Sequence, residues 1–342
     1  MDDEADYVTT LYTVSWVLGT LVVIVCTARI CGRAFVIHQT GWDDFFMVLG
    51  ALSALVCSSL VTVGVSHGLG RHQDQITDPN DLREAIKYTI IAPVMSIISS
   101  SSSKISIMIF LIRLMGMTAK KWHLYFLWGL SAILVALNIF AIVLIIRFCD
   151  PPARQWDKSL PGTCIDPKLQ LYGGAIQSAY NALLDIIVAA FPALFITKLN
   201  ITRKMKVGLC FLMSGSVFAA AATIMKVYLI KDLDKHSDIT WFWAPITLWY
   251  TAEMDVIIIV GTIPALWPLL KYFRKRNGGS GSGSGYGPYK NAVGNPEHVQ
   301  GSEAYQLSNS KNSKLRHGPI TRALQEVDDL RTFQTRVDEV DR

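Results

Sequence analysis

Four ionisable side chains lie inside apolar stretches of the sequence, where a charge is costly and needs a reason to be present. They are Lys104, Asp185, Glu253 and Asp255. At 1.5 Å of rise per residue, each lies about 12–16 Å from the C-terminal end of its expected helix. All four therefore lie at a similar depth in the membrane. We therefore expect a buried polar cluster with Lys104 as its cation. It would serve as a ligand or proton site or, with equal weight, as an ion-pair network that only fixes helix register.

Two further polar residues extend this cluster along one helical face. Gln177, Asn181 and Asp185 follow one another at intervals of four residues, which places them on a single stripe. Glu253 and Asp255 point about 200° apart, so they cannot both face one central site. Three carboxylates beside one ammonium would leave excess negative charge in a low dielectric, so at least one carboxyl group should be neutral.

The serines before Lys104 have a simpler interpretation. Ser96 and the run 99–103 are small hydroxyl residues, which commonly let membrane helices pack closely, and we favour that role. Lys226 lies near the other end of its expected helix, where we expect its side chain to reach the membrane surface.

The composition indicates which elements must position these residues. Of 342 residues, 51% are hydrophobic and 17% are charged, whereas an average soluble domain has about 25% charged residues. This excludes a soluble enzyme, a nucleic-acid-binding protein and a disordered chain. Helices of roughly 20 apolar residues cross a bilayer. The sequence therefore predicts an all-α, multi-pass membrane protein, a seven-helix bundle with spans at 10–28, 45–65, 88–112, 122–146, 171–196, 207–230 and 243–264.

Charges in the connecting segments predict the orientation. With the N-terminus outside, the cytoplasmic side up to residue 276 has 13 basic and 2 acidic residues, and the outer side has 10 basic and 14 acidic. This bias agrees with the positive-inside rule, so we expect the N-terminus outside and the C-terminus in the cytoplasm. The chain then divides into a short outer segment 1–9, the membrane domain 10–276 and a flexible cytoplasmic tail 277–342, rich in glycine and serine at its start. The tail is a candidate site for a cytoplasmic protein partner.

Two cysteines share one expected outer loop. Cys149 and Cys164 are 15 residues apart, and disulfides persist on the oxidising side of a membrane. A disulfide here would contribute roughly 3 kcal/mol by loop closure. The alternative is two free thiols. A zinc site is disfavoured because the loop has no histidine.

A second outer motif follows the second span. His67, Arg71 and His72 flank Gly68 and Gly70. Two histidines and an arginine at the membrane surface would suit anion binding or a response to pH. The glycines more simply permit a tight turn, and we favour that interpretation.

Several familiar chemistries are absent from the sequence. It has no glycine-rich phosphate loop, zinc-protease helix or nucleophile elbow. The last span has no lysine that could form a retinal Schiff base. We therefore expect no cofactor and no metal.

Several short motifs follow one another along the chain, beginning with Trp42-Asp43-Asp44 and Gly68-Leu69-Gly70-Arg71-His72. Their order resembles the fungal rhodopsin-like integral membrane family, which includes the satratoxin-cluster membrane protein and appressorium receptor-like proteins. One departure is Lys226, where the family usually has arginine, so planar bidentate pairing is lost. The resemblance implies a seven-helix fold and a fungal source. Its further elements are Lys104-Ile105-Ser106-Ile107, Phe110, Arg113, Cys149-Asp150-Pro151, Trp156, Cys164-Ile165-Asp166, Asn181, Asp185, Pro192, Tyr228, Ser237-Asp238-Ile239-Thr240, Glu253 and Pro264.

Two functions of different classes fit these observations. In the first, which we favour, the protein binds a lipophilic small molecule in its helix bundle and serves a fungal secondary-metabolite pathway, with acid/base chemistry at the cluster as one role. In the second, it is a receptor-like sensor that signals through its cytoplasmic loops and tail. The third expected helix ends in Leu111-Ile112-Arg113 rather than Asp-Arg-Tyr, which weakens the second. A transporter is less favoured, because no internal repeat is evident.

Overall fold

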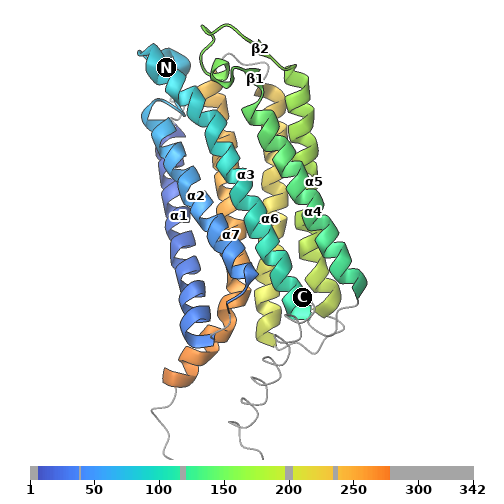
Figure 1. The fold of residues 1–342 in the computed structure, drawn as a ribbon. Helices are drawn as coiled ribbons and strands as arrows, with labels where there is room; N and C mark the ends of the chain where they lie inside the picture. The colour runs from blue at the N-terminus through green and yellow to red at the C-terminus, as the bar shows by residue number, and fades with distance from the viewer. Residues whose placement is uncertain (1–6, 38–39, 116–120, 197–202, 234–237, 278–342) are drawn as a thin grey trace, which may run out of the picture. The chain divides into compact units, whose positions relative to one another are not determined.

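The computed structural model describes residues 7–37, 40–115, 121–196, 203–233 and 238–277. The predicted tail and most of the predicted outer N-terminal segment lie outside these residues and stay predictions. Within the described part, the chain forms seven α-helices and a two-stranded hairpin (Figure 1). The helices are α1 (Tyr7–Cys31), α2 (Trp42–Ser66), α3 (Pro79–Met115), α4 (Lys121–Ile146), α5 (Pro167–Ile196), α6 (Arg203–Leu233) and α7 (Ile239–Asn277). A π-helical turn, Gly32–Ile37, follows α1, and short 3-10 turns lie at Gln73–Gln75 and Pro152–Gln155.

The helices run alternately up and down and form a closed bundle (Figure 1). Each packs against the next in the chain, and α7 packs back against α1. Helix α7 also contacts α2 and α3, so it is enclosed on several sides. We call the end that carries the hairpin the hairpin end, and the end where α1 stops and α2 begins the arginine end.

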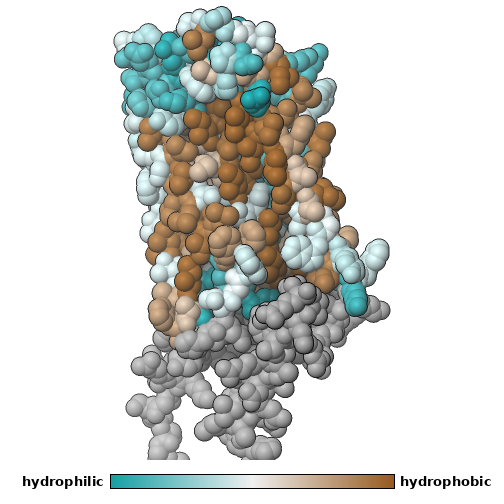
Figure 2. All heavy atoms as spheres, viewed as in Figure 1, coloured by the Kyte–Doolittle hydropathy of each residue, from teal (hydrophilic) through white to brown (hydrophobic). Residues whose placement is uncertain are grey.

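Six helices are long and apolar enough to cross a membrane among the residues described, namely α1, α2, α3, α4, α6 and α7. Large apolar side chains cover their outward faces, and Figure 2 shows apolar residues over the middle of one face, below a more polar top. The chain is therefore a multi-pass membrane protein. The expected fifth span, 171–196, coincides with α5, which carries the polar stripe of Gln177, Asn181 and Asp185. A crossing by α5 stays a prediction.

The hairpin carries the expected disulfide. Strands β1 (Cys149–Asp150) and β2 (Thr163–Cys164) pair antiparallel, with Cys149 opposite Cys164. The two sulfur atoms are bonded. The loop between α4 and α5 is therefore closed covalently at the hairpin end.

The serine run brings α2 and α3 close together. Ser99 Oγ donates a hydrogen bond to the Gly50 carbonyl at 2.8 Å. A Cβ atom at Gly50 would lie 2.4 Å from Ser103 Oγ and 3.2 Å from the Ser99 carbonyl oxygen. Only glycine permits this approach, which supports the packing role expected for the serines.

Candidate functional site: two buried charge networks

Lys104 lies in the interior of the bundle and reaches from α3 to α5. Its Nζ is 3.1 Å from Asp185 Oδ2 and 3.0 Å from Asn181 Oδ1. The two charged side chains are only 2% and 4% exposed. The structure thus pairs Lys104 with one of the carboxylates at its own depth, as the depth argument predicts.

Neutral polar side chains extend this pair toward α4. Gln177 Nε2 donates to Asn138 Oδ1 at 2.7 Å, and Asn138 Nδ2 donates to Ser101 Oγ at 2.7 Å. Asn181 Nδ2 donates to the Gln177 carbonyl at 2.9 Å. The sequence analysis missed Asn138, although an asparagine in the middle of an otherwise apolar helix is itself a signal. We name Lys104, Asp185, Asn181, Gln177, Asn138 and Ser101 the central cluster.

Glu253 pairs with Lys226, a cation that was expected to reach the membrane surface. Lys226 of α6 forms an ion pair with Glu253 of α7. The Lys226 side chain is 17% exposed and the Glu253 side chain 5%. The expectation that Lys226 reaches the membrane surface is therefore wrong. Because a buried carboxylate is costly without a cation, an inward turn of this lysine is more favourable than extension toward the membrane surface. The interior then holds two ion pairs rather than one cation among three carboxylates.

Asp255 stands apart from both pairs. It is fully buried, and neither of its carboxyl oxygens has a hydrogen-bond partner among the residues described. The divergence of Glu253 and Asp255 around α7 follows from their spacing of two residues. Cys57 of α2 lies near Asp255 but donates no hydrogen bond to it.

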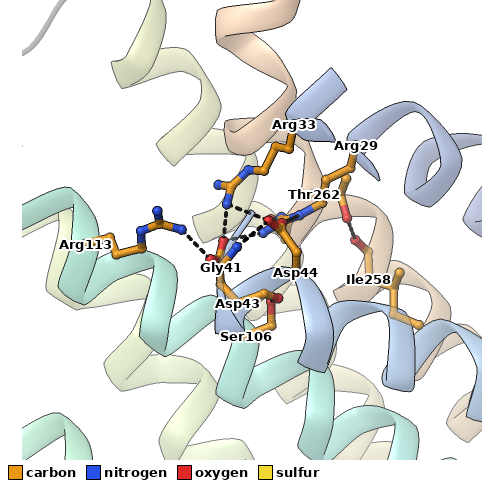
Figure 3. A network of polar contacts seen from close by, with 10 residues as sticks. Arg29, Arg33, Gly41, Asp43, Asp44, Ser106, Arg113, Ile258 and Thr262 are labelled. Carbon is orange, nitrogen blue, oxygen red and sulfur yellow. Dashed lines mark hydrogen bonds and ion pairs between the residues drawn. The ribbon is translucent and has the colours of Figure 1, made fainter. Parts of the chain in front are cut away.

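A second network lies at the arginine end, where three arginines converge on two aspartates (Figure 3). Arg29 Nη2 is 2.7 Å from Asp43 Oδ2, and Arg29 Nε is 2.8 Å from Asp44 Oδ1. Arg33 Nη1 contacts both aspartates, at 2.6 and 3.0 Å. Arg113 Nη1 is 2.7 Å from Asp43 Oδ1. This arginine network joins α1 and its π-helical turn to α2 and α3.

Backbone groups complete the arginine network. Ser106 Oγ donates to the Asp43 carbonyl, and the Gly41 amide donates to Asp44 Oδ2 at 3.2 Å. Arg29 Nη1 donates to the Gly261 carbonyl at 3.5 Å, which adds α7. A Cβ atom at Gly41 would lie 2.3 Å from the nearest guanidinium nitrogen of Arg113. The start of α2 is thus held by polar contacts from α1, its π-helical turn and α3, and Arg29 links this end to α7.

From the sequence, Arg29 and Arg33 were expected only to contribute to the charge bias that orients the chain. Arg29 is in fact 1% exposed and Asp43 is completely buried. Arg29 and Arg33 are four residues apart on one helical face, a spacing that could have indicated a shared partner. The adjacent pair Asp43-Asp44 was the corresponding signal on the next helix.

The histidine motif at the hairpin end joins loops to helices. Gly68 and Gly70 have positive φ angles of 113° and 93°, so the tight turn expected here is present. His67 Nδ1 lies 2.9 Å from Asp81 Oδ1 at the start of α3. The turn therefore connects α2 to α3 through a side-chain contact as well as through the backbone.

His72 and Arg71 face other neighbours. His72 Nδ1 lies 3.3 Å from Asp238 Oδ2, and its ring stacks on Trp241 with centroids 4.9 Å apart. Thr240 Oγ1 donates to the Arg71 carbonyl at 3.0 Å, while the Arg71 side chain is exposed. The two histidines thus contact two separate carboxylates. Anion binding or a pH response by His67, Arg71 and His72 stays a prediction.

The bundle, its apolar surface and its interior ion pairs define a polytopic helical membrane protein. Comparison with protein families gives a match to the fungal rhodopsin domain over residues 28–272. The chain belongs to the fungal rhodopsin family.

Three relatives come from filamentous fungi. An SAT4 family membrane protein of Emericella nidulans is 25% identical over 245 residues, covering 70% of this chain and 56% of the relative. Fugralins biosynthesis cluster protein 2 of Gibberella zeae is 27% identical, covering 49% and 42%. Wortmanamides biosynthesis cluster protein C of Talaromyces wortmannii is 22% identical, covering 87% and 77%. The matched parts span about half the length of the first two relatives.

Proposed function

We propose that the protein is a membrane component of a fungal secondary-metabolite pathway and binds a lipophilic small molecule at the central cluster. The observation that carries this proposal is the pairing of Lys104 with Asp185 and Asn181 in the middle of an apolar bundle. Charged groups at this depth are expensive, and they commonly mark ligand or proton sites. Two relatives are named for biosynthesis clusters, which supports the pathway setting.

The geometry suits a mostly apolar ligand with one polar group. The Lys104 ammonium and the Asp185 carboxylate offer a donor and an acceptor next to each other, while the surrounding core is apolar. Polar groups of this kind orient a ligand whose binding is otherwise driven by apolar burial. A paired acid and base could also exchange a proton with a bound intermediate.

We propose that all seven helices cross the membrane with the hairpin end outside. Helix α5 has 30 residues, about 45 Å at 1.5 Å per residue, and packs between α4 and α6. The disulfide favours the oxidising side for the hairpin end. Tyr7 at the start of α1 bonds to Gly70 at the same end. A C-terminal tag should then react with antibody only after cells are permeabilised, and labelling of intact cells would reverse the orientation.

Metabolite profiling of a deletion strain tests the function. Loss of one pathway product, restored by the wild-type gene, is the expected result. Complementation with Lys104→Met should fail even where the protein inserts, because Asp185 loses its cation. The double change Lys104→Met with Asp185→Asn removes both charges and should restore folding without restoring product. Recovery of both would show that the pair is structural. An unchanged metabolite profile in the deletion strain would contradict the pathway role.

A receptor-like sensor is the second candidate. The observation that favours it is the arginine network, which ties α1, α2, α3 and α7 together at the proposed cytoplasmic end. A ligand that shifted these helices would alter the surface available to a cytoplasmic partner. If the protein is a sensor, the deletion strain should make metabolites of unchanged structure but should show changed gene expression.

A further inference from the structure

Asp255 differs from every other buried carboxylate that the structure describes in the bundle. Asp43 and Asp44 meet arginines, Asp185 meets Lys104, and Glu253 meets Lys226. Asp255 is equally inaccessible, yet no donor reaches either of its oxygens within the described residues. Among the described residues, each of the other four therefore has a cation and Asp255 has none.

The groups packed around Asp255 offer no compensating charge. On α2, Cys57 lies near Asp255, but its thiol donates its hydrogen to the Ala92 carbonyl of α3. Among the described residues, the interior cations on the elements that contact α7 are paired with other groups: Lys104 on α3, Lys226 on α6 and Arg29 on α1. The α7 neighbours Met254 and Ile258 are apolar and fully buried.

An ionised carboxylate in such surroundings would lose its hydration without gaining a partner. Protonation removes this penalty and needs no further ligand, whereas a sodium ion would need several converging oxygens. We propose that Asp255 is a proton-binding site, held as a neutral carboxylic acid at neutral pH and separate from the central cluster. Its hydroxyl and carbonyl are then free to exchange hydrogen bonds or a proton with a molecule in the bundle. This inference does not depend on the proposed ligand or pathway.

Infrared spectroscopy of the purified full-length protein in lipid nanodiscs tests the assignment. A protonated carboxyl group has a carbonyl stretch above the frequencies of carboxylates and amides, and it shifts down in deuterated water. The wild-type protein should show one such band at neutral pH. Asp255→Asn should remove it with little change in unfolding temperature, because the amide is a neutral isostere. The matched control Glu253→Gln should keep the band.

Further measurements keep the proposal falsifiable. Absence of the band, or its survival in Asp255→Asn, would overturn the assignment. If Asp255→Asn does not fold, Asp255→Glu should fold and shift the band rather than abolish it. Unfolding temperatures in sodium chloride and in choline chloride should be equal. A stabilisation by sodium that Asp255→Glu weakens would show a metal ion in place of the proton and would also overturn the assignment.

Discussion

Asp43 is the carboxylate on which the arginine network depends most. It accepts from Arg29, Arg33 and Arg113 at 2.6–2.7 Å and is completely buried. Asp43→Asn would leave three guanidinium groups around one remaining carboxylate, Asp44. We therefore expect this substitution to destabilise the protein strongly.

The magnitude follows from the contacts that remain. Removing one partner of a buried ion pair costs about 3–5 kcal/mol. The loss should not be three times as large, because Arg29 and Arg33 keep Asp44, and Arg113 is 30% exposed and can turn toward solvent. Asp44→Asn leaves Asp43 in contact with all three arginines, so we expect a smaller loss of about 2–3 kcal/mol.

Unfolding in detergent, followed by tryptophan fluorescence, measures both losses. The control is Glu84→Gln, which breaks the half-exposed pair with Lys87 on α3 and should cost at most about 1 kcal/mol. Adding Arg113→Met to Asp43→Asn should recover little of the stability, because Arg113 can turn toward solvent once Asp43 is neutral. A loss for Asp43→Asn no larger than that for Glu84→Gln would refute the assignment of Asp43 as the centre of this network.

Three further predictions concern packing, the hairpin and coupling. Gly50→Val should separate α2 from α3 and cost about 1–3 kcal/mol by overpacking, measured as a lower unfolding temperature; an unchanged temperature would contradict the close approach. Cys149→Ser should lower the free energy of unfolding by about 3 kcal/mol. A reductant should not lower the stability of this variant further, since the disulfide is already absent. Lys226→Met and Asp43→Asn should be additive in a double-mutant cycle if the Lys226–Glu253 pair and the arginine network are independent. A coupling energy above about 0.5 kcal/mol would show that α7 links them.

The contact between Lys104 and Asp185 could be anticipated from the sequence because charges are rare in apolar spans. When few ionisable residues share a depth, the cost of leaving them unpaired limits the arrangements available. The six apolar helices were predictable for a related reason, since a spanning segment must satisfy its own backbone hydrogen bonds. The disulfide followed from two cysteines in one outer loop.

Contacts near helix ends were much harder to predict. A cation there can extend to the membrane surface or turn inward, and helix rotation decides between them. Arg29 and Lys226 both turn inward, although their positions in sequence are typical of surface charges. Asn138 was missed because its partners belong to other helices, so its own sequence neighbours gave no sign of them.

Helix α7 is the element through which the Lys226–Glu253 pair and the arginine network could influence each other. Glu253 pairs with Lys226, and the Gly261 carbonyl accepts from Arg29 eight residues later, about 12 Å along the helix axis. A ligand that separated Glu253 from Lys226 would change the forces on α7 and thereby the position of the Gly261 carbonyl. Because Arg29 is almost completely buried and also bonds both aspartates, it has little freedom to follow such a shift. Coupling between the Lys226–Glu253 pair and the arginine network would therefore favour a sensor, whereas additivity would favour a binding protein whose arginine network only stabilises the fold.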